Sequence, residues 1–340
     1  MHCGAARVLL LNLGGPDSLT AVRPFLYNLF SDREIIRLGP AFLQKPLAYL
    51  ISSLRAGKTC DAYARIGGKS PINEITVRQA KALEQQLRQE SEGKSRKSEA
   101  QVFVGMRYWS PRIGDVVRDI HHHGIQRLIV LSLYPHYSLA TTGSSLSELK
   151  RVLASYPDIK IHAIESWYDH PLYIDALVEK IEKGLRTFDA SRVAPSSLPA
   201  DIHVLFSAHS LPVKFIEEGD PYVDHIRATI RAVTAKAAIT WSLSYQSKSG
   251  PVAWLEPSTE TMLEELAAKG VRNLLVVPIS FVSDHIETLY EIDMLYKNMA
   301  AGLGIHLERT ESLNLSPLFI AALKDIVLKG MKEAGWEESQ

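Results

Sequence analysis

Residues 202–212 read IHVLFSAHSLP, an apolar run that ends abruptly in a turn of small residues carrying His209. A second run, LLVVPISFV at residues 274–282, leads directly into SDHIETLYE at residues 283–291. Consecutive apolar positions of this kind are typical of strands buried on both faces of a parallel sheet. In open α/β sheets, ligands bind at the carboxyl ends of the strands. The two stretches therefore predict an imidazole and several carboxylates facing each other across a cleft.

Apolar runs recur along the chain and alternate with stretches of helical periodicity. The runs expected to be strands lie at residues 7–13, 101–106, 127–133, 160–164, 202–206, 239–245, 274–282 and 305–309. The stretches expected to be helices lie at residues 76–90, 113–123, 171–185, 222–237, 259–269 and 316–334. This alternation predicts a doubly wound α/β architecture.

The expected strands fall into two sets of four that resemble each other. The sequence GIQRLIVL at residues 124–131 has a counterpart in GVRNLLVV at residues 270–277. We therefore predict two similar α/β halves, residues 1–165 and 166–340, with a ligand site in the cleft between them. The alternative is that βαβ units share this pattern without any duplication.

Composition excludes several classes of protein. Lys plus Arg and Asp plus Glu both number 38, so no overall basic field favours nucleic acid. Only Cys3 and Cys60 are present, which excludes a disulfide framework and an iron–sulfur cluster held by four cysteines of this chain. The first apolar run is too short to span a membrane and lacks the features of a signal peptide. We expect a soluble, cytoplasmic protein.

Residues 40–56 do not fit the alternation of expected strands and helices. Placing Pro46 in the first turn of a helix puts Leu47, Leu50, Ile51 and Leu54 on one apolar stripe. We interpret this segment as a helix packed on its own core. The alternative is an apolar lip over a large hydrophobic ligand, in contact with a membrane surface.

Three acidic residues follow the second quoted run at helical spacing. Asp284, Glu287 and Glu291 occupy positions i, i+3 and i+7, which predicts one shared helical face. One interpretation is a capping box formed by Asp284 and Glu287. The functional interpretation pairs Glu287 with His209, since imidazole and carboxylate suit ferrous iron and similar metals. One histidine and one glutamate would hold such a metal weakly and could release it.

Polar and aromatic residues gather after other apolar runs, at residues 107–109, 134–137, 141–145, 244–247 and at Trp254. Aromatic residues at one sheet edge, with Arg, Tyr and Ser, suit a large, flat, apolar ligand with acidic substituents. The chain has neither a G-x-G-x-x-G after its first strand nor a Walker A lysine pattern. Nucleotide binding is therefore not expected.

Seven motifs then identify a family. They are LNLGGP (11–16), RIGGKSPI (65–72), GMRY (105–108), YPHYS (134–138) with TTGS (141–144), FSAHSLP (206–212), YQS (245–247) and SDHIETLYE (283–291). In this order, over nearly the whole chain, they resemble the ferrochelatases, which insert ferrous iron into a porphyrin as the terminal step of haem synthesis. The resemblance implies a class II chelatase-like fold with two Rossmann-like halves, each with a parallel four-stranded sheet. It implies iron as substrate and a monomer with no permanently bound cofactor. The carboxyl-terminal residues contain no cysteine, so no iron–sulfur cluster is expected.

The resemblance also implies roles for individual residues. His209 and Glu287 are the expected metal-site residues, with Asp284, His285 and Glu291 as support behind Glu287. The residues expected to hold the porphyrin and its propionates are Arg55, Tyr63, Ser70 and Arg107. The residues expected to line its faces are Leu13, Tyr108, Trp167 and Trp254.

Our hypothesis for the mechanism is a distorted protoporphyrin IX held between His209 and Glu287, one group on each side. His209 would accept a pyrrole proton or bind iron, and Glu287 would deliver metal or remove protons. Within the enzyme class, the alternative is iron insertion into coproporphyrin or metal insertion into another tetrapyrrole. Outside it, the alternative is a carrier of haem or metal without chemistry.

Overall fold

The computed structural model describes residues 6–90, 100–188, 202–250 and 252–336. Two segments that the sequence predicts to be loops, residues 91–98 and 190–199, lie outside the described residues. The chain divides into two compact units. The first contains the described residues up to Trp167 and from Leu315 onward, and the second runs from Tyr168 to Asn314. Each unit is built on one parallel sheet, as predicted.

The sheet of the first unit has four parallel strands in the order β2-β1-β3-β4. They are β1 (Arg7–Asn12), β2 (Gln101–Met106), β3 (Arg127–Ser132) and β4 (Lys160–Ile164). Each lies within one residue of its predicted bounds. Because β1 and β3 are buried at nearly every position, their apolar runs mark them clearly in the sequence.

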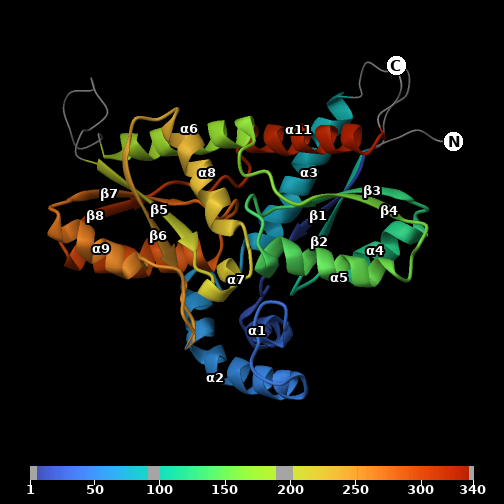
Figure 1. Ribbon diagram of the computed structural model, residues 1–340, viewed down its shortest axis with the longest axis horizontal. Coiled ribbons are helices and arrows are strands. Elements are labelled where there is room, and N and C mark those ends of the chain that lie inside the picture. The colour runs from blue at the N-terminus through green and yellow to red at the C-terminus, as the bar shows by residue number, and fades with distance from the viewer. Residues whose placement is uncertain (1–5, 91–99, 189–201, 251, 337–340) are drawn as a thin grey trace. The chain divides into compact units, whose positions relative to one another are not determined.

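Helices cover both faces of this sheet (Figure 1). The helices of the first unit are η1 (Leu19–Ala21), α1 (Val22–Ser31), η2 (Ala41–Leu43), α2 (Gln44–Arg65), α3 (Ile72–Glu90), α4 (Ile113–His122), η3 (Leu139–Gly143), α5 (Ser144–Leu153) and α11 (Pro317–Glu333). Helices α4 and α5 lie on one face, where Val117 and Leu149 join Leu9 and Leu128 in a buried cluster. Helices α3 and α11 lie on the other face.

The last helix belongs to the first unit, whereas the sequence division placed it in the half 166–340. Helix α11 packs on α3, β3 and β4. Its Gly330 allows this approach, because a Cβ there would lie 2.8 Å from Cδ1 of Ile164. Near the start of α11, the rings of Phe319 and Trp167 lie 6.0 Å apart. Close packing of small and large side chains, and not position along the chain, decides which sheet this helix covers.

The second unit repeats the topology, with four parallel strands in the order β6-β5-β7-β8. They are β5 (Ile202–His209), β6 (Thr240–Gln246), β7 (Asn273–Pro278) and β8 (His306–Arg309). Strand β5 continues to His209, beyond its predicted end at residue 206. Strand β7 ends at Pro278, four residues before its predicted end. The residues between Pro278 and the next helix form an irregular connection at the carboxyl edge of the sheet.

The helices of the second unit also cover both faces of its sheet. They are α6 (Pro171–Thr187), α7 (Val213–Glu217), α8 (Tyr222–Thr234), α9 (Thr259–Ala268), η5 (Glu287–Tyr296) and α10 (Lys297–Gly302). Helices α6 and α8 lie on one face and α9 on the other (Figure 1). On the α9 face, Leu263 and Ile292 pack against Leu205 and Val276. Helix η5 is a π-helix, a wider coil with i→i+5 hydrogen bonds that often occurs at functional sites.

The apolar stripe expected to pack on a core is largely exposed. In η2 and the first part of α2, Phe42 is 77% exposed and Leu54 is 75% exposed, and Leu50 is exposed as well. The buried residues here are small or polar, such as Ala48 and Ser52, where α2 packs against α1. The packed-helix interpretation therefore holds only in part: Leu47 and Ile51 are half-buried, whereas Leu50 and Leu54 are exposed, because close contact with α1 selects small residues. Within the described residues, no helix is both long and apolar enough to cross a membrane.

Candidate active site

His209 and Glu287 meet at the carboxyl edge of the second sheet. His209 ends β5, and Glu287 begins η5, the helix that follows β7. Because β5 and β7 are paired neighbours, their ends bring the two side chains together. His209 Nδ1 lies 2.9 Å from Glu287 Oε2, and the Ser280 hydroxyl accepts the His209 backbone N–H at 2.9 Å. The His209 side chain is 36% exposed and that of Glu287 is 16% exposed.

This contact corrects the expectation that a tetrapyrrole lies between the two groups. At 2.9 Å, His209 and Glu287 are hydrogen-bonded and leave no space for a ring. Both arise from neighbouring strands of one sheet, so both approach a ligand from the same side. The pair uses His209 Nδ1, which leaves Nε2 as the ring nitrogen available to a ligand.

The carboxyl group of Glu291 lies behind this pair, and the hydroxyl of Ser247 contacts both Glu287 and Glu291. Ser247 Oγ lies 2.9 Å from Glu287 Oε2 and 2.5 Å from Glu291 Oε2. Gln246 Nε2 lies 3.5 Å from the same two oxygens. The Ser207 hydroxyl donates to Gln246 Oε1 at 2.6 Å, so the amide of Gln246 turns its N–H groups toward the acids. Sequence reasoning missed these roles; the only signal was the polar YQS triplet after an apolar run.

The pKa values of Glu287 and Glu291 are shifted in opposite directions, and that of His209 is raised. Burial, with Glu287 nearby, raises the pKa of Glu291 to about 8. Burial also opposes ionisation of Glu287, but the charge and hydrogen bond of His209 hold the pKa of Glu287 at about 2. Burial acts to lower the pKa of His209, yet the neighbouring Glu287 raises it above its ordinary value. Near neutral pH, the site therefore combines an ionised carboxylate, a basic imidazole and a neutral acid.

Asp284 does not share the face of Glu287 and Glu291. Its carboxylate accepts hydrogen bonds from Asn314 at 2.7 Å and Ser312 at 2.7 Å, and pairs with Arg309 at 3.1 Å. It lies before the π-helix and provides no cap for it, which also excludes the capping box. The expectation of one shared face is wrong here, because residues some 25–30 positions later in the chain hold this side chain.

Arg309, at the end of β8, connects this aspartate to the π-helix. Its guanidinium donates two hydrogen bonds to Asp293, both at 2.8 Å, in addition to its contact with Asp284. Asp293 lies in η5, so the buried arginine holds the helix from the side of β8. This clamp fixes the backbone that carries Glu287 and Glu291.

His285 is buried beside Glu287 and stays neutral. Its Nδ1 lies 3.0 Å from the Ser283 carbonyl, to which it donates, and its Nε2 lies 3.9 Å from Glu287 Oε1. Burial lowers the pKa of His285 below its ordinary value. The ring therefore supports Glu287 without adding a charge.

A metal ion could find two ligands here, an imidazole nitrogen of His209 and a carboxylate oxygen of Glu287. No group of three or more His, Cys, Asp or Glu side chains suited to a metal ion occurs in the part of the chain that the structure describes. Two protein ligands leave the remaining coordination positions open. Such a site suits an ion in transit better than a structural metal.

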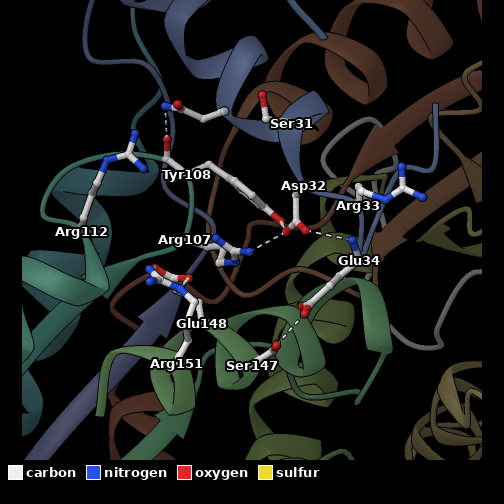
Figure 2. A pocket seen from close by; sticks show the side chains of 11 residues that line it. Ser31, Asp32, Arg33, Glu34, Arg107, Tyr108, Arg112, Ser147, Glu148 and Arg151 are labelled. Atoms are coloured by element: carbon white, nitrogen blue, oxygen red, sulfur yellow. Dashed lines mark hydrogen bonds and ion pairs between the residues drawn. The ribbon is translucent and has the colours of Figure 1, made fainter. Parts of the chain in front are cut away.

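The first sheet has its own polar cluster at the carboxyl end of β2. Arg107 and Tyr108 converge on Asp32, which follows α1 (Figure 2). Asp32 Oδ2 accepts from Arg107 at 2.7 Å, from the Tyr108 hydroxyl at 2.7 Å and from the Ser144 hydroxyl at 2.8 Å. Burial and the adjacent Asp32 raise the pKa of Tyr108. Asp32 was not identified from the sequence, since a lone aspartate after a helix carries no distinctive signal.

This cluster borders a cavity of about 450 Å³. Besides Asp32, Arg107 and Tyr108, it is lined by Asn28, Ser31, Arg33, Glu34, Arg112, Ser147, Glu148 and Arg151 (Figure 2). Two ion pairs lie in this lining, Arg107 with Asp32 and Arg151 with Glu148. At Asp32, the first sheet thus presents a carboxylate held by an ion pair, whereas the second presents reactive groups.

Two other predicted residues lie near the ends of the first strands. The Leu13 carbonyl accepts the backbone N–H of Tyr108 at 3.0 Å, which places it directly after β1 and beside β2. The Ser70 backbone N–H donates to the Pro16 carbonyl at 2.7 Å. The structure therefore brings Leu13 and Tyr108 together, with Ser70 next to the loop that follows Leu13.

The remaining predicted residues differ in accessibility. Arg55 is exposed on α2, with its guanidinium 5.5 Å from the Phe30 ring centre, whereas Tyr63 is buried near the end of the same helix. Trp167 is buried, and its indole N–H donates to the Ser132 carbonyl at 2.8 Å. Such packing is that of a core residue.

Trp254 lies beside the loop that follows His209. It forms an isolated bridge with Pro212, and the neighbouring Leu255 donates its backbone N–H to the Leu211 carbonyl at 3.0 Å. Its indole N–H is buried and has no hydrogen-bond partner among the described residues. A buried donor without a partner is costly, which is consistent with a ligand near this side chain.

Comparison with known proteins identifies the relatives of this chain. The family model described as Ferrochelatase matches residues 6–331. The ferrochelatase of Geotalea uraniireducens (strain Rf4) is 53% identical over 325 residues, 95% of this chain and 97% of that protein. That of Geobacter metallireducens (strain ATCC 53774 / DSM 7210 / GS-15) is 54% identical with the same coverage. Among solved structures, SirB from Bacillus subtilis with Fe3+ aligns with a TM-score of 0.49 at 14% identity, covering 75% of this chain and 94% of that one.

Proposed function

This chain belongs to the ferrochelatase family, and we propose that it inserts ferrous iron into protoporphyrin IX at His209 and Glu287. Iron insertion into a porphyrin for haem biosynthesis is the activity of the family, and the chain is accordingly a chelatase. The observation that carries the residue assignment is the contact between His209 and Glu287 at the edge of the second sheet, with Glu291 behind it.

The chemistry of the reaction explains why such a pair is useful. A free porphyrin carries two pyrrole N–H groups that must lose their protons before the four nitrogens can bind a metal. His209 Nε2 is free to accept such a proton while Nδ1 donates to Glu287. The negative Glu287 stabilises the imidazolium that forms, which is the usual benefit of a carboxylate behind a catalytic histidine.

Both groups act from one face of the porphyrin in this proposal. Iron would then approach from the opposite face or pass the pair before insertion, and the ring must bend to turn its nitrogen lone pairs toward the metal. The indole N–H of Trp254 is buried and has no hydrogen-bond partner among the described residues, which supports the proposal that a ligand binds close to the loop after His209. For the first unit, contacts of Leu13, Arg55, Tyr63, Ser70, Arg107, Tyr108 and Trp167 with porphyrin stay predictions.

The experiment is an anaerobic assay with ferrous iron, with protoporphyrin IX and coproporphyrin as separate substrates. Loss of free-base porphyrin absorption measures insertion, and product analysis identifies the metalloporphyrin. We expect higher kcat/KM with protoporphyrin IX. A higher kcat/KM with coproporphyrin would identify coproporphyrin as the substrate. No turnover with either porphyrin, together with equally tight binding of free and metallated porphyrin, would favour a carrier of haem or metal.

We also propose that the exposed apolar surface of η2 and α2 contacts a membrane. This surface is formed by Phe42, Leu43, Tyr49, Leu50 and Leu54. Exposed side chains of this kind insert into the interface between headgroups and acyl chains. Co-sedimentation with phosphatidylcholine–phosphatidylglycerol vesicles should fall several-fold in the double variant Phe42→Ser and Leu54→Ser. Unchanged vesicle binding would contradict this proposal.

A further inference from the structure

The backbone of His209 lies beyond the point where β5 and β7 stop pairing. Their ladder ends where the Ile279 backbone N–H donates to the Ser207 carbonyl at 3.0 Å. On the other side of β5, the Ser210 backbone N–H donates to the Gln246 carbonyl at the end of β6. Since successive residues of a central strand direct their backbone groups to opposite neighbours, the His209 N–H and C=O face the side of β7. Backbone groups at such a position need partners other than the sheet.

Two side-chain hydroxyls supply these partners. Ser280, in the connection after β7, accepts the His209 N–H at 2.9 Å. Tyr222, the first residue of α8, donates its hydroxyl to the His209 carbonyl at 3.0 Å. The side chains of Ser280 and Tyr222 also hydrogen-bond each other. The peptide units on both sides of the His209 Cα are thereby held by one connected set of contacts.

Tyr222 is itself fixed by the segment that follows His209. After α7, the Asp220 backbone N–H donates to the Phe215 carbonyl at 3.0 Å, and Asp220 Oδ1 accepts the Tyr222 backbone N–H at 3.0 Å. Both Tyr222 and Ser280 are buried, so water competes little for their hydroxyls. Burial raises the pKa of Tyr222 above its ordinary value, and the phenol therefore keeps the proton that it donates. The chain thus folds back to hold the backbone of its own histidine.

We propose that Tyr222 and Ser280 are positioning residues that fix the direction of the His209 imidazole through its backbone. The proposal deepens the proposed function and rests on it, because this imidazole is the group that accepts the pyrrole proton. Rotation of either flanking peptide unit would turn the His209 Cβ and carry the ring away from Glu287, which lies 2.9 Å from Nδ1. The role of both hydroxyls is exerted through His209 and requires no contact with the porphyrin.

Thr229 distinguishes this role from a purely structural one. It lies in α8, as Tyr222 does, is buried, and donates its hydroxyl to the Tyr168 carbonyl at 2.7 Å. The contact is of the same kind, from a buried hydroxyl to a backbone carbonyl, but the backbone it holds is not that of His209. If such contacts only stabilise the fold, loss of the Thr229 hydroxyl should have the same consequences as loss of the Tyr222 hydroxyl.

The kinetic test removes one hydroxyl at a time. Tyr222→Phe and Ser280→Ala should each lower kcat for iron insertion roughly 10- to 100-fold, because small displacements of a reacting group are costly, with little change in porphyrin KM. Thr229→Val, the matched control, should lose comparable stability in urea denaturation and keep the wild-type kcat. Equal kcat in Tyr222→Phe, Ser280→Ala and Thr229→Val would overturn the proposal.

A second kinetic test asks whether Tyr222 acts through His209. In a His209→Ala background, Tyr222→Phe should lower the residual kcat no further, since the group that it positions is already gone. Thr229→Val in the same background provides the control for any general loss of stability. A further loss as large as that caused by Tyr222→Phe in the wild type would show that Tyr222 acts by another route and would contradict the positioning role.

A third readout does not depend on turnover. Proton NMR spectra of the ligand-free protein at neutral pH should contain a downfield signal from the His209 Nδ1–H that donates to Glu287, assigned by its loss in His209→Ala. The signal should shift or broaden in Tyr222→Phe and Ser280→Ala and stay in place in Thr229→Val. Its absence from the wild type, or a signal unmoved in both variants, would overturn the proposal. If the signal behaves as expected but the wild type metallates no porphyrin, the proposed function fails and the positioning of His209 stands.

Discussion

The two sheets share one strand order but differ in the polar groups at their carboxyl ends. In the first, Asp32 is saturated by Arg107, Tyr108 and Ser144, so its charge is balanced. In the second, His209, Glu287 and Glu291 form a cluster with two acids and one base. Saturated ion pairs hold a structure in place, whereas unbalanced, buried acids and bases can exchange protons. Both sheets have the same topology, so a few residues at the strand ends decide which sheet can take part in chemistry.

The second unit also contains a saturated cluster, and it lies beside the reactive one. Arg309 with Asp284 and Asp293 resembles Arg107 with Asp32, a buried guanidinium that satisfies carboxylates from other elements. The second sheet therefore has a saturated ion-pair cluster at Arg309 and a reactive cluster at His209. Among the described residues, the matching end of the first sheet has the saturated cluster at Asp32. This contrast can be tested by changing each part in turn.

The largest expected effect comes from the reactive pair. His209→Ala removes the proton acceptor, and Glu287→Gln removes the charge that stabilises its protonated form. Each should lower kcat about 10²- to 10⁴-fold while free porphyrin still binds. Steady-state kinetics together with porphyrin fluorescence quenching measures both quantities.

Glu311→Gln is the matched control for this comparison. Glu311 is an acid of the same unit whose exposed carboxylate pairs with Lys180 and Lys183. Its replacement should leave kcat within twofold. Near-normal turnover in either His209→Ala or Glu287→Gln would remove the functional distinction between the two sheets.

The sequence predicts the sheets better than the contacts at their edges. The four central strands, β1, β3, β5 and β7, follow most clearly from consecutive apolar residues, because burial on both faces leaves that pattern. The meeting of His209 with Glu287 follows in part, since both come after strands of one sheet. The π-helix does not follow, because residues four apart lie near each other in an α-helix as well. The prediction for Asp284 is wrong for a different reason. Its partners Arg309 and Asn314 come from a later strand and loop, which the local spacing of acidic residues does not reveal.

Breaking either clamp should destabilise the protein strongly. Arg309→Met leaves Asp284 and Asp293 without their buried cation, and Arg107→Met does the same to Asp32. We expect each to cost about 3–5 kcal/mol in the free energy of unfolding. Urea denaturation of both variants measures this cost. A loss below about 1 kcal/mol in Arg107→Met alone would mean that the two clusters are not equivalent.

A pH-dependent effect should separate the two acids of the reactive cluster. The pKa of Glu291 is raised from 4.5 to about 8, so the native state binds this proton more tightly than the unfolded chain does. This contribution is complete below pH 4.5 and is lost as the pH rises toward 8. Glu287 has the opposite sign: its pKa of about 2 contributes stability above pH 4.5 that is lost in acid.

Glu291→Gln should therefore flatten the decline in stability between pH 5 and pH 9. At pH 9 the variant should exceed the wild type by up to about 5 kcal/mol, the free energy that corresponds to a pKa raised from 4.5 to about 8. Denaturant midpoints measured across this range provide the check, with Glu311→Gln as the exposed control. Parallel curves for Glu291→Gln and the wild type would show that Glu291 is an ordinary ionised carboxylate.

The smallest effect should be the same in both sheets. Ser138 accepts the Ala140 N–H at 3.1 Å at the start of η3, and Ser258 accepts the Thr261 N–H at 3.2 Å at the start of α9. Each satisfies one free donor of a helix end, so Ser138→Ala and Ser258→Ala should each cost about 1 kcal/mol. Urea denaturation should give equal losses, and kcat per folded molecule should be unchanged in Ser258→Ala. Helix ends obey the same energetics in both units, so a difference well above 1 kcal/mol would mean that the units diverge in their scaffold as well as in their chemistry.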